Sequence, residues 1–141
     1  MKLKSILIIV LAAMALHGRA QLTVNISNIS MLQGELYIAV YDDAERFLNV
    51  ELAAEKKIVE ITGETASVVI SGLKAGKYSV AVFQDLNGNG TLDMKKGRIP
   101  DEPFGFSNNA RGKFGPPGFN KASFSFCDTG EIDIKMVNNE R

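Results

Sequence analysis

Tyr78-Ser79-Val80-Ala81-Val82-Phe83 is the stretch of sequence that decides the fold. Its β-branched and aromatic residues are typical of a β-strand, and Gly76 precedes it while Asp85 follows. Runs in which apolar and polar residues alternate occur on both sides of it, and we expect a strand in each. Together with residues 77–83, the predicted strands are 22–27, 36–41, 57–62, 66–71, 122–127 and 132–137.

About seven short strands in one chain predict an all-β domain over residues 21–141, and an antiparallel β-sandwich is the expected architecture. A small closed barrel is the structural alternative. Residues 47–54 are the one stretch expected to form a short helix or an irregular excursion. The last two strands are expected to form a closing hairpin around Asp128-Thr129-Gly130.

Residues 95–120 follow no period and form a long Gly/Pro/Phe-rich loop. The stretch holds all four prolines of the chain and four of its eight phenylalanines: Phe104, Phe106, Phe114 and Phe119. Because each phenylalanine has apolar surface to bury, we expect the loop to fold over one end of the sandwich. The alternative is an aromatic contact surface for a sugar, a lipid or a protein partner.

Residues 1–20 resemble a secretory signal peptide. Lys2 and Lys4 form a basic start, an apolar run covers residues 6–16, and small residues at Gly18 and Ala20 are typical of a cleavage site after Ala20. The apolar run is too short to span a bilayer, which needs about 20 residues. We therefore expect export, to the periplasm or beyond the cell, and no membrane span.

Cleavage would change the charge and the chemistry of the mature chain. Three basic residues would leave, so that 13 basic residues face 16 acidic ones and the net charge becomes −3. A mildly acidic domain without a basic cluster is a poor binder of nucleic acid. The single histidine, His17, would leave too, which excludes Ser-His-Asp and Cys-His catalysis. Cys127 cannot form an internal disulfide, and we expect it to be a small, partly buried strand residue.

The segment from Asp85 to Asp93 directly follows the best strand and carries oxygen-bearing side chains at alternate positions. Asp85, Asn87, Asn89 and Asp93 are candidate calcium ligands, and Thr91 occupies the place where calcium loops offer a backbone carbonyl. Calcium takes six to eight oxygen ligands at ~2.3–2.6 Å, and alternate residues of a tight loop can converge on one ion. Gly90 holds the sixth position, where such loops turn sharply.

This loop differs from an EF-hand at its twelfth position, where Lys96 replaces the bidentate glutamate. Asp85 and Asp93 are the two carboxylates within it, to which Asp101 or Glu102 could add a ligand. Two carboxylates predict weak binding, with Kd near ~10⁻⁴–10⁻³ M. The alternative is an ion-free turn, because Asn and Gly also tolerate the positive φ angles of tight turns.

Residues 71–93 resemble the bacterial exported family called domain of unknown function 2141. A Gly-x-Tyr strand leads into an Asp-x-Asn-x-Asn-Gly-x-x-Asp loop, and an Ile-Pro-x-Glu-x-x-Gly-Phe-Ser-Asn-Asn segment follows at residues 99–109. The early strand at residues 34–41 also fits the family. The resemblance implies a secreted immunoglobulin-like or transthyretin-like sandwich and no established activity.

From these features we expect a secreted, non-enzymatic and monomeric β-sandwich module with a calcium-stabilised loop, which binds an unidentified component of the envelope or cell surface. The alternatives are a carboxylate-dependent envelope hydrolase and a carrier of a small apolar ligand. Residues 105–109 are either a site of the family or a structural clasp. We prefer the clasp, because Asn108 and Asn109 can donate and accept hydrogen bonds with the backbone.

Overall fold

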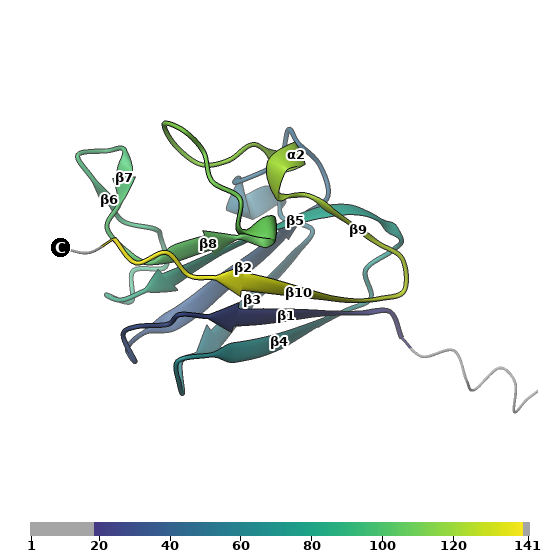
Figure 1. Cartoon of the computed structure of the whole chain (residues 1–141), viewed down its shortest axis with the longest axis horizontal. Helices are drawn as coiled ribbons and strands as arrows, with labels where there is room; N and C mark the ends of the chain where they lie inside the picture. Colours follow the sequence, from purple (N-terminus) through teal and green to yellow (C-terminus); the bar gives the residue numbers. More distant parts are fainter. Residues whose placement is uncertain (1–18, 140–141) are drawn as a thin grey trace, which may run out of the picture.

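The computed structural model of the protein describes residues 19–139 and is drawn in Figure 1. The predicted signal peptide, residues 1–20, lies outside the described residues except for its last two. Within the described part, strands dominate. The helices there are a single α-helical turn, α2 (Phe119–Ala122), and two 3-10 turns, η1 (Val50–Leu52) and η2 (Ser107–Asn109).

The first sheet has three strands in the order β10-β1-β4. They are β1 (Gln21–Ser27), β4 (Ala66–Ser71) and β10 (Thr129–Lys135). Strand β1 is antiparallel to β4 and parallel to β10, so that Val24 lies opposite Val68 on one side and Ile132 on the other. Leu22, Val24 and Ile26 are buried while their neighbours are less so, which is the alternation that the sequence shows.

The second sheet is antiparallel and has the order β3-β2-β5-β8, with β9 paired to the start of β5. Its strands are β2 (Glu35–Tyr41), β3 (Glu55–Glu60), β5 (Gly76–Asp85), β8 (Phe104–Phe106) and β9 (Phe124–Phe126). A separate small hairpin joins β6 (Met94–Lys95) to β7 (Ile99–Pro100). The long strand β5 therefore connects the core to the Asp85–Asp93 loop.

Both sheets turn one face toward a common apolar core. In Figure 1 the strands of the second sheet pass behind those of the first. The core includes alternate residues of the central strands, namely Leu22, Val24 and Ile26 of β1, Leu36, Ile38 and Val40 of β2, and Tyr78, Val80 and Val82 of β5. The prediction of a mostly β chain is thus confirmed.

The predicted closing hairpin at residues 122–137 is wrong. Strand β9 pairs with β5 and β10 pairs with β1, so the chain passes from one sheet to the other between Phe126 and Thr129. Cys127 lies in this crossing and is exposed, not partly buried as expected. Phe126 is the last residue of β9, and its side chain lies in the core, so Cys127 follows the end of the strand. Alternation in the sequence indicates which face of a strand is buried, but it does not indicate which strand it pairs with.

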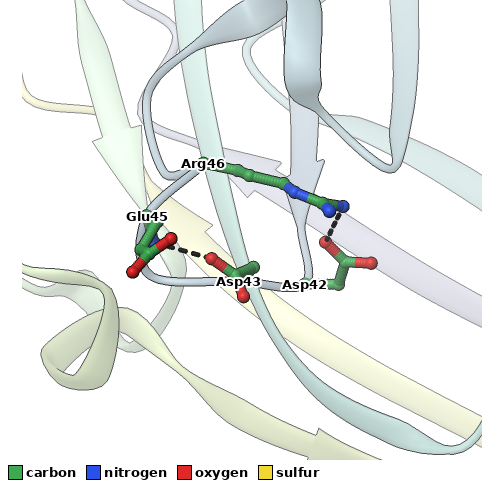
Figure 2. Close-up of polar contacts among 4 residues, drawn as sticks. All are labelled: Asp42, Asp43, Glu45 and Arg46. Carbon is green, nitrogen blue, oxygen red and sulfur yellow. Dashed lines mark hydrogen bonds and ion pairs between the residues drawn. The ribbon is translucent and has the colours of Figure 1, made fainter.

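The excursion after β2, residues 42–54, covers part of the outer face of the second sheet and ends in η1. Figure 2 shows its first turn, where the Asp43 carboxylate accepts a hydrogen bond from the Glu45 N–H at 2.7 Å and Arg46 approaches Asp42 at 3.9 Å. This turn directs Phe47 back onto the sheet, where its ring packs edge-on against Tyr41 with centroids 5.4 Å apart.

The Gly/Pro/Phe-rich stretch is more regular than the sequence suggests, because it contains β8 and α2. Phe119 is buried beside Phe47, and Phe104 and Phe106 are half-buried, which agrees with the expected fold of this loop over the domain. Phe114 differs from the other three, with 94% of its surface exposed.

Candidate functional site

Asp85 is the last residue of β5 and the base of the predicted calcium loop. Its side chain is 1% exposed, and both carboxylate oxygens accept backbone hydrogen bonds. Oδ1 accepts from the Gly88 N–H at 2.9 Å, and Oδ2 accepts from the Gly90 N–H at 2.8 Å. The φ angles of Gly88 and Gly90 are 75° and 76°, a conformation that glycine adopts readily. The carboxylate therefore stabilises a turn that suits these two glycines.

The next two candidate ligands, Asn87 and Asn89, repeat one local pattern. The amide oxygen of Asn87 accepts from the Asn89 N–H at 3.2 Å, and that of Asn89 accepts from the Thr91 N–H at 3.0 Å. Each bond closes a small turn between an asparagine side chain and the backbone two residues later. Thr91 itself is exposed.

Asp93 lies where the amide groups of Asn87 and Asn89 meet. Nδ2 of Asn87 donates to Asp93 Oδ2 at 2.6 Å, and Nδ2 of Asn89 donates to Oδ1 and Oδ2 of Asp93 at 3.0 and 3.1 Å. The structure therefore brings three of the five predicted site residues together by their side chains. Asp85 lies beneath them with its oxygens on the backbone, and Thr91 joins through its N–H.

Glu102 closes the loop from outside the predicted set. Its side chain is 3% exposed, and its two oxygens accept from the Leu86 N–H at 2.8 Å and the Asp93 N–H at 3.1 Å. One carboxylate thus joins the two ends of the loop. Asp101, the other residue considered as an extra ligand, pairs with Lys95 at 3.0 Å and donates its N–H to the Asp93 carbonyl at 2.8 Å. The sequence suggested Glu102 as an additional ligand, but in the structure its two oxygens bind backbone N–H groups of the loop.

The segment before β2 supports the loop from the other side, and nothing in the sequence suggested this contact. Gln33 donates from Nε2 to the Leu86 carbonyl at 2.9 Å. Gln84 is fully buried and donates from Nε2 to the carbonyls of Met31 and Gln33, each at 2.7 Å. The buried Gln84 amide therefore holds the segment before β2, and Gln33 of that segment contacts the loop backbone.

Carboxylates near the loop also act on a tyrosine. Partial burial, with the nearby carboxylates of Glu35 and Asp85, raises the pKa of Tyr37, whose ring stacks on Phe83 at a centroid distance of 5.0 Å. Across residues 19–139, no three His, Cys, Asp or Glu side chains form a group that could hold a metal. A cation at this loop would therefore rely on amide and carbonyl oxygens beside the two carboxylates, which is chemistry suited to calcium.

A second polar cluster, residues 107–109, has the contacts expected of a clasp. The buried Ser107 hydroxyl accepts from the Val80 N–H at 2.9 Å and donates to the Ala122 carbonyl. Asn108 donates to the Ser123 carbonyl at 2.7 Å, and Asn109 accepts from the Lys135 N–H at 2.8 Å. These bonds connect η2 to β5, to the end of α2 and to β10.

A small open pocket of about 140 Å³ lies beside this clasp. Its lining consists of Gly105, Phe106, Asn109, Ala110, Arg111, Lys135 and Val137, and so includes two cations and no carboxylate. The described residues, 19–139, contain no helix that is long and apolar enough to cross a membrane.

Comparison with known proteins found one family model that fits the chain. The model is described as an uncharacterized protein conserved in bacteria (DUF2141), and it matches residues 24–135. The matched range extends from β1 to the end of β10 and contains the whole loop and the clasp. No curated protein and no solved structure matches the chain.

Proposed function

The chain belongs to the DUF2141 family, an uncharacterized family of bacterial proteins, and we propose that it is an exported, non-enzymatic binding module whose Asp85–Asp93 loop is stabilised by calcium. The observation that supports the calcium site is the convergence of Asn87 and Asn89 on Asp93. Bound calcium would supply a positive charge that attracts these oxygens and links the two ends of the loop.

The residues present fit calcium by the chemistry of their oxygen atoms. Asp93 is met by two amide N–H donors, and a cation there would replace these donors and engage the oxygens of the same three side chains. Glu102 would hold the loop backbone in place while the outer ligands turn, and the Asp85 carboxylate would bind the ion with lone pairs that its backbone hydrogen bonds leave free. The ligands would be Asp85, Asn87, Asn89 and Asp93 with the carbonyl of Thr91.

For the architecture we propose an immunoglobulin-like or transthyretin-like β-sandwich. Support comes from the common core, to which both sheets contribute alternate residues, as the two inner faces of a sandwich do. The parallel pairing of β1 with β10 departs from a purely antiparallel arrangement. Such a module would be a monomer that presents its loops to a component of the envelope or cell surface.

The calcium site is tested by thermal unfolding of the exported protein in millimolar calcium and in chelator. With Kd near ~10⁻⁴ M and ~1 mM calcium, binding to the folded state alone adds about 1.4 kcal/mol, which raises the Tm by several degrees. Magnesium, which keeps its waters and demands octahedral geometry, is expected to raise the Tm much less. Identical melting curves in calcium and chelator would show that the loop is an ion-free turn.

Substitutions inside and outside the loop distinguish calcium ligands from residues that do not bind the ion. Asp93→Ala removes one of two charged ligands and is expected to abolish the calcium-dependent rise, whereas Asp128→Ala, an exposed aspartate in the crossing between the sheets, is the matched control and keeps it. Asn87→Asp is expected to enlarge the rise. In the unsubstituted protein the Asn87 amide donates to Asp93 Oδ2 at 2.6 Å. Without calcium the substitution places a second carboxylate there, which repels Asp93, and bound calcium would relieve that repulsion.

The hydrolase and the carrier make other demands on the structure. A hydrolase needs carboxylates grouped in a cleft, and a carrier needs an enclosed apolar cavity. Asp85 and Glu102 are buried carboxylates, but their oxygens accept backbone N–H groups of the loop. Both hypotheses stay alternatives that no observation favours over the binding module.

A further inference from the structure

The stretch between Glu102 and Asp128 contains no acidic residue. Its charged residues are Arg111, Lys113 and Lys121, so this part carries a charge of +3 within a mature chain of expected net charge −3. Among the described residues, the ion pairs of the protein lie elsewhere, at Arg46 and Lys95. The side chains of Arg111 and Lys113 are therefore available to an anionic partner.

Phe114 stands at the tip of this basic stretch, with 94% of its surface exposed. Lys113 places its ammonium 5.5 Å from the centre of the ring. In Figure 1 the loop that leads into α2 projects from the body of the molecule. The exposed ring therefore has a cation directly beside it, whereas Phe104, Phe106 and Phe119 are at least partly buried.

The tip is a tight turn. A Cβ on Gly112 would overlap the carbonyl oxygen of Gly115 and lie 2.6 Å from that of Pro116, so the two sides of the tip touch through their backbones. Below it, Pro117 and Phe119 are buried. Lys121 also ties the stems together, because its ammonium donates to the Arg111 carbonyl at 3.1 Å. Phe114 is thus presented to solvent at the end of a tight turn whose base is buried.

We propose that this tip, residues 110–118, docks on an anionic bilayer surface, with Phe114 inserted among the lipids and Arg111 and Lys113 on the phosphate groups. The proposal rests on the proposed export, which would bring the module to a membrane surface. Basic residues near an anionic leaflet are attracted to it, and an aromatic ring gains by leaving water. A glycan site would need hydroxyl, amide or carboxylate side chains to bind sugar hydroxyls, and residues 110–118 have none.

The test uses sedimentation of the exported protein with vesicles of phosphatidylglycerol and phosphatidylcholine in equal parts, compared with vesicles of phosphatidylcholine alone. Binding is expected to the anionic vesicles and to weaken as salt is raised. Phe114→Ala should weaken it about tenfold, and Arg111→Gln with Lys113→Gln should weaken it roughly 30-fold. The matched controls are Leu32→Ala, at another exposed apolar residue, and Lys56→Gln with Lys57→Gln, at another exposed basic pair. Both controls should leave binding unchanged.

Because the chain has no tryptophan, Phe114→Trp supplies a single fluorescent reporter at the tip. Its emission is expected to shift to the blue on anionic vesicles and to be quenched by brominated acyl chains, while Leu32→Trp should do neither. Equal binding to neutral vesicles, equal losses in the control variants, or binding to an anionic polysaccharide without any vesicle binding would overturn the proposal. All arms contain chelator, so failure of the calcium site would not alter them.

Discussion

Gly34 shows how a single residue determines the position of the candidate site. It precedes β2 with a φ of 75°, and its α-carbon faces the backbone of Asp85. A Cβ there would overlap the Asp85 carbonyl oxygen and lie 3.2 Å from the α-carbon of Leu86. The close approach lets the segment before β2 support the calcium loop, and it depends on the absence of a side chain.

Gly34→Ala is therefore expected to lower the free energy of unfolding by at least about 2 kcal/mol, from left-handed strain plus overlap with backbone. Urea unfolding measures this change. Gly72→Ala is the matched control, because Gly72 has a φ of 82° but no atom near the place of its Cβ, so it should lose only about 1 kcal/mol. Equal losses in both variants would contradict the proposed overlap.

The three tyrosines of the chain share one electrostatic property. Burial raises the pKa of Tyr41, whose side chain is 1% exposed, and burial is also the largest cause of the raised pKa values of Tyr37 and Tyr78. The phenolate form is disfavoured in the folded state because it would lose its hydration there.

The unfolded chain therefore loses its tyrosine protons first, near pH 10, and the free energy of unfolding is expected to fall as the pH rises from there through the folded pKa values. Tyr41→Phe should make this fall shallower. Ultraviolet titration of phenolate absorbance in native and urea-unfolded protein measures the difference directly. Superimposed titration curves would refute the effect of burial.

At the scale of the elements, η2 connects parts of the fold that are distant in sequence. Ser107 bonds to the backbone of β5 and of α2, while Asn108 and Asn109 bond to the backbone beside β9 and within β10. Asn108 and Asn109 adopt φ angles of 59° and 48°, which asparagine tolerates better than most residues. The strained turn is thus maintained by the hydrogen bonds that it makes.

Ser107→Ala is expected to cost about 1–3 kcal/mol of unfolding free energy, because it leaves a buried backbone N–H and a buried carbonyl without this partner. Ser125→Ala, on the exposed side of β9, makes the same chemical change without a buried bond and should be close to neutral. Urea unfolding compares the two. If both variants were equally stable, the hydroxyl would have no structural role.

At the scale of the whole molecule, the first and last strands lie side by side. Strand β1 is the centre of its sheet, with β10 parallel on one side and β4 antiparallel on the other. At its start, the Gln21 N–H donates to the Asp128 carbonyl at 3.0 Å. Gln21 is the first residue of β1, and it is also the first residue that the mature protein would keep if cleavage follows Ala20.

The exported protein is accordingly expected to begin at Gln21, with β1 complete. Intact-mass measurement of protein recovered from the exported fraction checks this, and a mass that includes Met1 would contradict it. A start beyond Leu22 would remove residues that pair with both β4 and β10, and we expect no stable protein of that length.

The sequence by itself determined the strand segments and the candidate loop. Alternation identified β1 and β2 because one face of each strand must be buried, and β-forming residues identified β5; both signals are local. The spacing of oxygen side chains from Asp85 to Asp93 was equally local, and the structure brings Asn87, Asn89 and Asp93 together.

Only the tertiary structure decided which elements meet. Strand β9 pairs with β5 and not, as the sequence had suggested, with the last strand. Glu102, nine residues beyond Asp93, closes the loop. Phe114 is exposed, whereas Phe119 is buried. Each outcome depends on contacts between segments far apart in the chain or on how a turn directs a side chain. A period in the sequence specifies the face of a strand, but pairing and burial follow from the packing of all the strands together.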